Sequence, residues 1–203
     1  MIPAVLVLAT GNRGKTAELA ALVAEWGPAI EVRSLRDHPG VTLPEETGST
    51  YEANAALKAR AVAVATGLPA LADDSGLEVD ALGGEPGVHS ARYGATDAER
   101  IARLLAALAG RAPAERTARF RCVVVVAWPD GRVVTAEGAC EGTITGAPSG
   151  AGGFGYDPVF RSADLARTFA EAPPEEKARV SHRARALRAL GVIMRRDTPG
   201  SRA

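Results

Sequence analysis

The chain has 203 residues, of which 46% are hydrophobic and 24% charged, a composition typical of a globular protein that buries its own core. Its 24 Lys and Arg residues are balanced by 24 Asp and Glu, so it lacks the basic excess that broad binding to nucleic acid requires. The two cysteines, Cys122 and Cys140, are too few for a disulfide framework or a cysteine-based metal cluster.

The apolar segments are too short to cross a membrane. The apolar start, Ile2 to Ala9, is far shorter than the span of about 20 residues that a bilayer requires. It also lacks the basic segment and the small-residue cleavage site of a signal peptide. We therefore expect a cytoplasmic protein with no membrane partner.

The first predicted elements follow the pattern of an α/β fold. The apolar run Val5 to Leu8, closed by a glycine-containing turn, predicts a buried strand. Apolar residues at helical spacing follow it, at Leu19, Leu22 and Val23, and 30–34 is a second candidate strand. Strand, glycine turn, helix and strand in this order favour an α/β protein.

The next segment predicts a helix followed by a short strand. Ser49 with Glu52 forms a capping box for a helix that extends to about Thr66, with Asn54 and Lys58 on one face. A strand at 70–72 then leads into the segment Asp73-Asp74-Ser75-Gly76.

The second half of the sequence predicts another helix, two strands and a C-terminal helix. Thr96 and Glu99 cap a helix, and the apolar run 120–128 predicts a strand that a turn at 129–131 joins to a strand at 132–137. A glycine-rich loop covers 150–157. Four residues then form the buried stripe of the last helix: Ala184, Leu187, Gly191 and Met194.

The turn after the first strand is the first candidate site. Residues 9–16 fit a relaxed phosphate-loop pattern, in which backbone N–H groups at a helix start, a lysine and the Thr10 hydroxyl could hold an anion. The alternative is an ordinary strand-to-helix turn in which Gly11 and Gly14 only relax the backbone.

Two adjacent acids, Asp73 and Asp74, are the second candidate site. Carboxylates at the end of a strand suit Mg²⁺, which prefers oxygen ligands, and one of them could accept a proton from an attacking water. Neighbouring like charges are costly unless a cation offsets them. The alternative is an ordinary turn, because Asp, Ser and Gly all favour turns.

Two later segments could contact a nucleobase or a phosphate. The loop 152–157 combines three glycines with Phe154 and Tyr156, whose rings could stack on a base. Lys177 and the segment 181–183 bring several hydrogen-bond donors close together. The alternatives are a glycine-rich turn with buried aromatic residues and a solvated helix face.

Five motifs, taken in this order, resemble those of the inosine triphosphate pyrophosphatase family. They are Thr10-Gly11-Asn12-Arg13-Gly14-Lys15, Glu45-Glu46-Thr47-Gly48, Asp73-Asp74-Ser75-Gly76, Phe154-Gly155-Tyr156-Asp157, and Lys177 with Ser181-His182-Arg183. They extend from residue 10 to residue 183, so the resemblance covers nearly the whole chain, and five blocks in order are more specific than any one of them.

The resemblance implies a fold, an assembly and an activity. The fold would be a single elongated α/β domain over 1–197, with two lobes around a central cleft and a mixed sheet, and 198–203 would be a disordered tail. The protein would be a homodimer that uses Mg²⁺ and has no nucleic-acid partner. It would hydrolyse ITP, dITP and XTP to the monophosphate and pyrophosphate, which removes non-standard purine nucleotides from the pool.

The matching positions imply a role for each site residue. The phosphates would be held by Thr10, Gly11, Asn12, Arg13, Gly14 and Lys15, with help from Lys58 and Lys177. Mg²⁺ would be bound by Glu46 and Asp74, and Asp74 would also be the proton acceptor. The base and sugar site would be lined by Ser75, Phe154, Gly155, Tyr156, Asp157, His182 and Arg183. Participation of Glu45 or Asp73 in metal binding stays open, and 161–174 carries no motif.

Two rival hypotheses follow from the same residues. The first is a phosphate-loop ATPase or kinase, in which Thr16 would contact Mg²⁺. It would leave the motifs at 154–157 and 177–183 without a purpose. The second is a nucleotide-binding protein without enzymatic activity, which would have no need for an acid pair placed to hold a metal.

Overall fold

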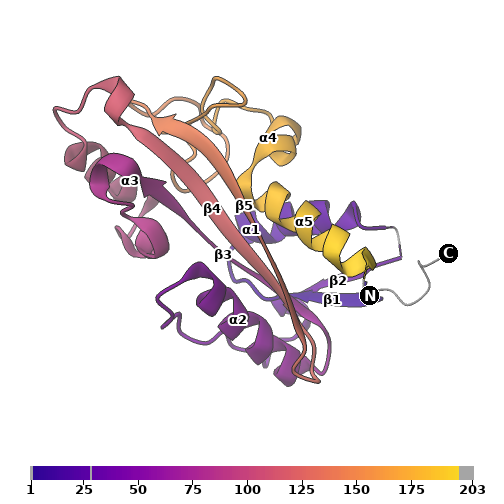
Figure 1. Ribbon diagram of the computed structural model, residues 1–203. Coiled ribbons are helices and arrows are strands. Elements are labelled where there is room, and N and C mark those ends of the chain that lie inside the picture. The colour runs from indigo at the N-terminus through magenta and orange to yellow at the C-terminus, as the bar shows by residue number, and fades with distance from the viewer. Residues whose placement is uncertain (1, 28, 197–203) are drawn as a thin grey trace. The chain divides into compact units, whose positions relative to one another are not determined.

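The computed structural model describes residues 2–27 and 29–196, and Figure 1 shows its ribbon. The strands are β1 (Val5–Leu8), β2 (Glu31–Ser34), β3 (Ala70–Val79), β4 (Thr117–Ala127), β5 (Val133–Ile144) and β6 (Phe160–Ser162). The helices are α1 (Arg13–Ala24), α2 (Tyr51–Thr66), α3 (Asp97–Ala107), α4 (Pro174–Val180) and α5 (His182–Arg196). The tail 198–203, which we expected to be disordered, lies outside the described residues.

These strands form a six-stranded mixed sheet in the order β2-β1-β3-β4-β5-β6. β1 pairs in parallel with β2 and with β3, so that Val7 lies beside Arg33 on one side and Ala70 on the other. β5 pairs with β6 in the antiparallel direction. The predicted α/β class with a mixed sheet is confirmed.

The described chain divides into two compact units. Unit 1 comprises the described residues within 1–74, 122–138 and 183–203, and unit 2 comprises 75–121 and 139–182. Three boundaries fall inside β3, β4 and β5, so each of these strands contributes residues to both units, and the fourth falls in α5 between His182 and Arg183.

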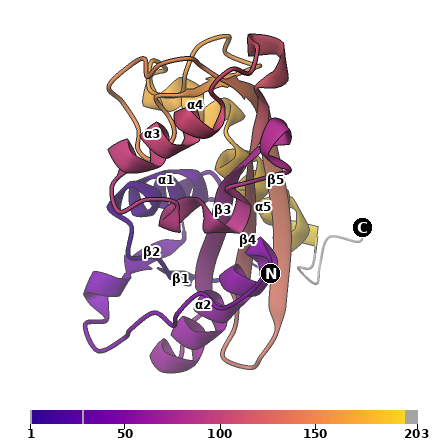
Figure 2. The same cartoon turned by 90° about the vertical axis from the view of Figure 1, so that its left-hand side faces the viewer.

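Unit 1 has helices on both faces of its part of the sheet. Leu6 and Leu8 of β1 and Leu71 of β3 form a core with apolar residues of α1 and α5. The intervening residues Val7 and Ala72 are also fully buried, and they face the other way because side chains alternate along a strand. Figures 1 and 2 show α2 on the side of these strands opposite to α5.

Unit 2 has a separate core that is rich in aromatic residues. The ring of Phe160 lies 4.6 Å from that of Phe120 and 5.1 Å from that of Phe169, measured between ring centroids. Leu104 of α3 and Leu77 of β3 are fully buried in the same core. Each unit therefore buries its own apolar cluster.

The structure corrects the prediction for the strand that carries the two acids. β3 does not end before Asp73 but continues to Val79, so Asp73 and Asp74 lie within the strand instead of in a turn. In the second half of β3, buried Leu77 and Val79 alternate with the more exposed Glu78, as expected for a strand. Both apolar residues belong to the core of unit 2. Burial on both faces thus overrides the turn preference of Asp, Ser and Gly.

The start of α2 differs from the prediction by one residue. The N-cap is Thr50, not Ser49: Thr50 has extended backbone angles, and its side chain accepts a hydrogen bond from the N–H of Ala53. The cap predicted at Thr96 for α3 is confirmed, because its side chain accepts a hydrogen bond from the N–H of Glu99. The side chain of Glu99 accepts from the N–H of Ala95 at 2.8 Å instead of from Thr96.

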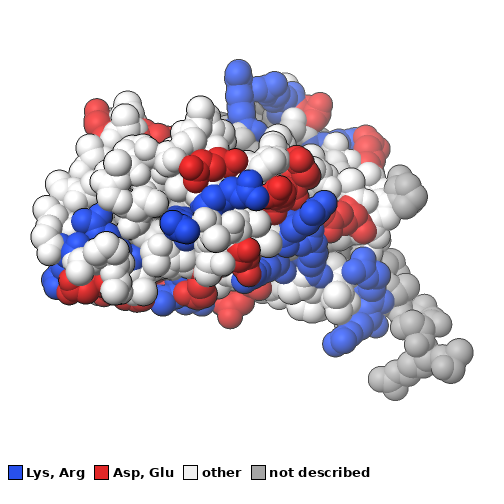
Figure 3. Space-filling view, turned by 90° about the horizontal axis from the view of Figure 1, so that it is seen from above, with Lys and Arg blue, Asp and Glu red and all other residues white. Residues whose placement is uncertain are grey.

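The surface agrees with the balanced charge of the sequence. Acidic and basic side chains lie next to one another at several places on the face shown in Figure 3. In the part of the chain that the structure describes, no helix is both long and apolar enough to span a membrane.

Candidate active site

The segment 10–15, which leads into α1, is stabilised by hydrogen bonds from its backbone to its own side chains. The side chain of Asn12 caps this helix by accepting a hydrogen bond from the N–H of Lys15 at 3.0 Å, and the hydroxyl of Thr10 accepts one from the N–H of Asn12 at 3.2 Å. Gly14 and Lys15 therefore lie in the first helical turn, where the positive end of the helix dipole favours an anion.

The hydroxyl of Thr16 has a different role from the one that the phosphate-loop hypothesis requires. It donates a hydrogen bond to the backbone oxygen of Asn12 at 2.9 Å, within the first turns of α1. A hydroxyl engaged in this way supports the helix start and does not favour the ATPase or kinase alternative.

Asp73 is fully buried in unit 1 among cations. Its Oδ2 atom lies 3.0 Å from the Nζ of Lys15 and 3.0 Å from Nη2 of Arg183, and Arg183 also pairs with Glu18. Burial alone would raise the pKa of Asp73, but the charges of Lys15 and Arg183 outweigh burial and lower it. Asp73 is therefore an ionised anchor that joins β3 to α1 and α5.

Asp74 points to the opposite face, toward α2. Its Oδ2 accepts a hydrogen bond from Nδ2 of Asn54 at 3.0 Å, and its Oδ1 lies 3.7 Å from the Nζ of Lys58. Burial raises the pKa of Asp74 despite the charge of Lys58. A buried carboxylate with a raised pKa is suited to accept a proton.

Lys58 connects Asp74 to the loop that precedes α2. Its Nζ lies 2.5 Å from Oε1 of Glu46. Glu45, the adjacent acid, is exposed, so the structure favours Glu46 as the acid of this loop that belongs to the site. The choice of Glu46 over Glu45 as a metal ligand stays a prediction.

Glu46 and Asp74 supply donors that fit Mg²⁺. Both carboxylates lie close to one ammonium group, that of Lys58, so a single cation already lies between them. Proteins usually hold Mg²⁺ through one or two carboxylates, together with water and substrate phosphates. Among residues 2–27 and 29–196, no group of three or more His, Cys, Asp or Glu side chains could enclose a metal ion. The pair fits a magnesium ion that is bound jointly with a phosphorylated substrate.

The glycine-rich loop of unit 2 is tied down by Asp157. The carboxylate of Asp157 accepts a hydrogen bond from the N–H of Phe154 at 2.9 Å and lies 2.6 Å from the Nζ of Lys177. The same ammonium lies 4.9 Å from the centre of the Phe154 ring. Gly153 has a φ of 72°, and a Cβ there would lie 2.1 Å from Oδ2 of Asp157, so only glycine fits.

The two aromatic residues of this loop have different environments. Tyr156 belongs to the core of unit 2, and its hydroxyl donates a hydrogen bond to the backbone oxygen of Ser90 at 3.0 Å. Phe154 is only partly buried. The predicted stacking on a base therefore suits the ring of Phe154, while Tyr156 fixes the loop to its unit.

The segment 181–183 is divided between the two units. His182 belongs to unit 2, where its ring stacks on that of Phe120 with a centroid distance of 4.7 Å and an interplanar angle of 14°. Arg183 belongs to unit 1, where it is buried against Asp73.

The predicted site residues are divided between the two units. Unit 1 holds Thr10, Gly11, Asn12, Arg13, Gly14, Lys15, Glu46, Lys58, Asp74 and Arg183. Unit 2 holds Ser75, Phe154, Gly155, Tyr156, Asp157, Lys177 and His182. Two partners were not predicted, Asn54 beside Asp74 and Glu18 beside Arg183. The shared helix face of Asn54 and Lys58 was a usable signal for the first, whereas Glu18 offered none.

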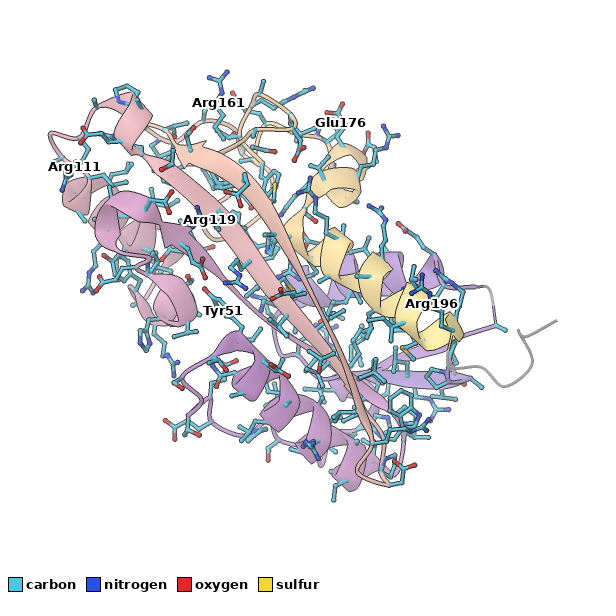
Figure 4. All side chains as sticks on the ribbon, in the orientation of Figure 1. Tyr51, Arg111, Arg119, Arg161, Glu176 and Arg196 are labelled. Carbon is cyan, nitrogen blue, oxygen red and sulfur yellow. The ribbon has the colours of Figure 1, made fainter. Side chains whose placement is uncertain are left out.

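A surface hollow of unit 2 is a weaker candidate. Its volume is about 420 Å³, and its lining includes Asp80, Arg119, Glu141 and Arg161. Arg119, labelled on β4 in Figure 4, already forms ion pairs with Asp80 at 2.9 Å and Glu141 at 3.2 Å. These charges largely satisfy one another, so the hollow lacks the distinctive chemistry of the groups around Asp74.

The site combines a glycine-containing turn that carries Lys15 with two carboxylates that lie near Lys58. These features define a class of protein: an α/β protein that can bind an anionic ligand together with a cation. The chain belongs to the Ham1 family, whose sequence model matches residues 6–192. The family membership predicted from the motifs is confirmed.

Relatives and solved structures agree with this assignment. A Thermus thermophilus protein named dITP/XTP pyrophosphatase is 56% identical over 187 residues, which are 91% of this chain and 89% of that protein. A Geobacillus kaustophilus protein of the same name is 52% identical, with 91% of each chain covered. The structure of a HAM1 protein from Coxiella burnetii is similar with a TM-score of 0.83 and 42% identity, covering 95% of this chain and 98% of that one.

Proposed function

We propose that this protein hydrolyses the non-standard purine nucleoside triphosphates ITP, dITP and XTP to the monophosphate and pyrophosphate, and so removes them from the nucleotide pool. The observation that carries the proposal is the buried carboxylate of Asp74. It lies near Lys58, which also pairs with Glu46. Its strand, β3, pairs with β1, the strand that leads into the phosphate-type turn. The dITP/XTP pyrophosphatases that are more than half identical to this chain support the same activity.

The residues of unit 1 divide the chemistry between them. A water molecule would attack the α-phosphorus, and Asp74, the buried carboxylate beside α2, would accept its proton. Lys15 and Lys58 would stabilise the negative charge that develops on the pyrophosphate leaving group. Mg²⁺, held by Glu46 and Asp74, would screen the triphosphate and lower the pKa of the attacking water.

Selection of the base would come from hydrogen-bond donors and an aromatic ring. A donor of His182 would bond to the 6-keto oxygen of hypoxanthine or xanthine. The 6-amino group of adenine cannot accept such a hydrogen bond. A buried donor left unpaired is strongly disfavoured, so adenine would be rejected. Phe154 would offer its ring to the base, and Ser75 would contact the sugar.

A panel of nucleoside triphosphates tests the proposal. With Mg²⁺ present, we expect pyrophosphate to be released from ITP, dITP and XTP much faster than from ATP, when pyrophosphate and orthophosphate are measured separately. Omission of Mg²⁺, with a chelator added, should abolish the release. Orthophosphate as the main product from ATP would instead support the phosphate-loop alternative.

The variant Asp74→Asn separates an enzyme from a protein that only binds nucleotides. Loss of a general base lowers rates by about 10²- to 10⁴-fold, so turnover of dITP should fall by at least roughly 100-fold. Binding of ITP, measured by calorimetry in the absence of Mg²⁺, should persist because the phosphate and base contacts remain. Pyrophosphate release at the wild-type rate would show that Asp74 is not the proton acceptor.

The place and assembly of the protein are part of the same proposal. We place the reaction in the cytoplasm, where the nucleotide pool is found, and expect a homodimer, as the motif resemblance implies. Light scattering combined with size-exclusion chromatography measures the assembly directly, and a mass equal to one chain of 20.9 kDa would contradict it.

A further inference from the structure

Asn54 is a buried side chain of α2 whose two polar ends are both engaged. It lies three residues after Tyr51, which Figure 4 labels at the start of the helix, and it has no exposed surface. Its Nδ2 donates a hydrogen bond to Oδ2 of Asp74 at 3.0 Å, and its Oδ1 accepts one from the N–H of Gly48 at 2.8 Å. One carboxamide therefore joins β3 to the loop that precedes α2.

The loop approaches Asn54 so closely that only glycine fits at residue 48. A Cβ built there would lie 2.6 Å from Oδ1 of Asn54 and 2.8 Å from the Cβ of Ala53. Gly48 comes two residues after Glu46, so the contact that fixes Gly48 also limits where the Glu46 carboxylate can lie.

The two oxygens of Asp74 have different neighbours on α2. Oδ2 is bound by Asn54, while Oδ1 faces Lys58 at 3.7 Å. Asn54 and Lys58 are four residues apart and lie on the same face of the helix. The torsion of a carboxylate about its last bond is soft, so the hydrogen bond from Asn54 is what limits its rotation.

We infer that Asn54 is a positioning residue that sets the orientation of Asp74 and holds the Glu46 loop beside it. The inference rests on the proposed function, because that function makes Asp74 the proton acceptor. Displacement of a reacting group by about 1 Å can cost roughly 100-fold in rate, so an unheld Asp74 would slow the chemical step. Both polar ends of the Asn54 side chain are engaged by the protein itself, through Asp74 and Gly48.

The variant Asn54→Leu removes both hydrogen bonds with little change in volume. Loss of a hydrogen bond to a charged group predicts a fall in kcat of roughly 10- to 100-fold for dITP, with KM nearly unchanged. The matched control is Thr66→Val at the other end of α2, which removes a hydrogen bond from Thr66 to the backbone oxygen of Val62. This control should keep the wild-type kcat even where its melting temperature falls.

A second variant and a measurement without substrate complete the test. Gly48→Ala should also lower kcat, because the added Cβ must push the loop away from Asn54. In nucleotide-free and metal-free protein, the Gly48 amide should exchange its hydrogen faster in Asn54→Leu than in the wild type or in Thr66→Val. If Asn54→Leu folds poorly, Gly48→Ala with the same exchange measurement decides the question.

The outcomes separate this inference from the proposed function. The inference is overturned if folded Asn54→Leu keeps the wild-type kcat, if only KM changes, or if the exchange of the Gly48 amide is unaffected. The proposed function fails if the wild-type protein releases no pyrophosphate from any nucleoside triphosphate. In that case the exchange of the Gly48 amide still shows whether Asn54 holds the loop.

Discussion

Asp73 and Asp74 are neighbours in the sequence, yet their surroundings are opposite. Burial raises the pKa of Asp74, whereas the cations around Asp73 outweigh burial and lower its pKa. The ionised form of Asp73 therefore stabilises the fold, whereas burial disfavours the ionised form of Asp74 despite the nearby ammonium of Lys58. Asp73 is therefore suited to stabilise the fold, and Asp74 to take part in the proposed reaction.

The variant Asp73→Asn should be strongly destabilising. It would leave Lys15 and Arg183 without their shared buried counter-charge, and breaking a buried ion pair typically costs about 3–5 kcal/mol in unfolding free energy. Chemical denaturation at pH 7 measures the change. The matched control is Asp130→Asn, an exposed acid whose ion pair with Arg132 is long, at 3.9 Å.

The same variant has a defined pH dependence. A carboxylate with a lowered pKa stabilises the folded state above the unfolded pKa of about 4, and this contribution is lost as the pH falls below it. The stability difference between the wild type and Asp73→Asn should therefore shrink on acidification. A difference below about 1 kcal/mol at pH 7 would show that Asp73 is not an anchor of the fold.

At the scale of elements, the N-cap of α2 is directly testable. Thr50→Ala removes the hydrogen bond from the N–H of Ala53 at 3.1 Å and should lower the unfolding free energy by about 1 kcal/mol. Ser49→Ala is the matched control, since Ser49 lies one residue outside the cap. Equal effects of the two variants, measured by denaturant unfolding, would contradict the cap at Thr50.

The elements that the sequence predicted well are those whose own pattern determines them. The apolar run of β1, the helical spacing of α1 and the cap of α3 all depend on nearby residues. The full length of β3 could not be predicted, because Asp73 and Asp74 are stable in a strand only when Lys15, Lys58 and Arg183 approach from other elements. Such partners are far apart in the sequence.

The candidate site shows the same division. Its motifs identified the acids and the lysines, because each chemistry requires particular residue types. The hydrogen bond from Asn54 to Asp74 spans 20 residues, and the ion pair from Arg183 to Glu18 spans 165. Contacts of this kind depend on how elements pack, so local spacing could only suggest the first and gave no sign of the second.

At the scale of the whole molecule, β3, β4 and β5 each contribute to both units, so we expect the units to unfold together. Both tryptophans of the chain, Trp26 and Trp128, belong to the core of unit 1. Leu104→Ala in the core of unit 2 should cost about 2–5 kcal/mol. The transition followed by tryptophan fluorescence should then move to lower denaturant, although the substitution is in the other unit.

A matched variant in unit 1 gives the reference for this experiment. Leu187→Ala removes an equally buried side chain from the core that contains the tryptophans. Both variants should shift one and the same transition, seen alike by fluorescence and by circular dichroism. An unchanged fluorescence transition in Leu104→Ala would show that the units unfold separately.

Because the side chains of β3 alternate between its two faces, the positions of Asp73 and Asp74 depend on the number of residues that precede them in the strand. If pairing with β1 is kept at Ala70 and Leu71, deletion of Ala72 would move Asp74 into the place of Asp73 and Ser75 into that of Asp74. Lys15 and Arg183 would keep a carboxylate, while Lys58 would face a hydroxyl. Evolution of this strand should therefore proceed through substitutions. The loss or gain of one codon would exchange the residues on the face of Lys15 and Arg183 with those on the face of Lys58.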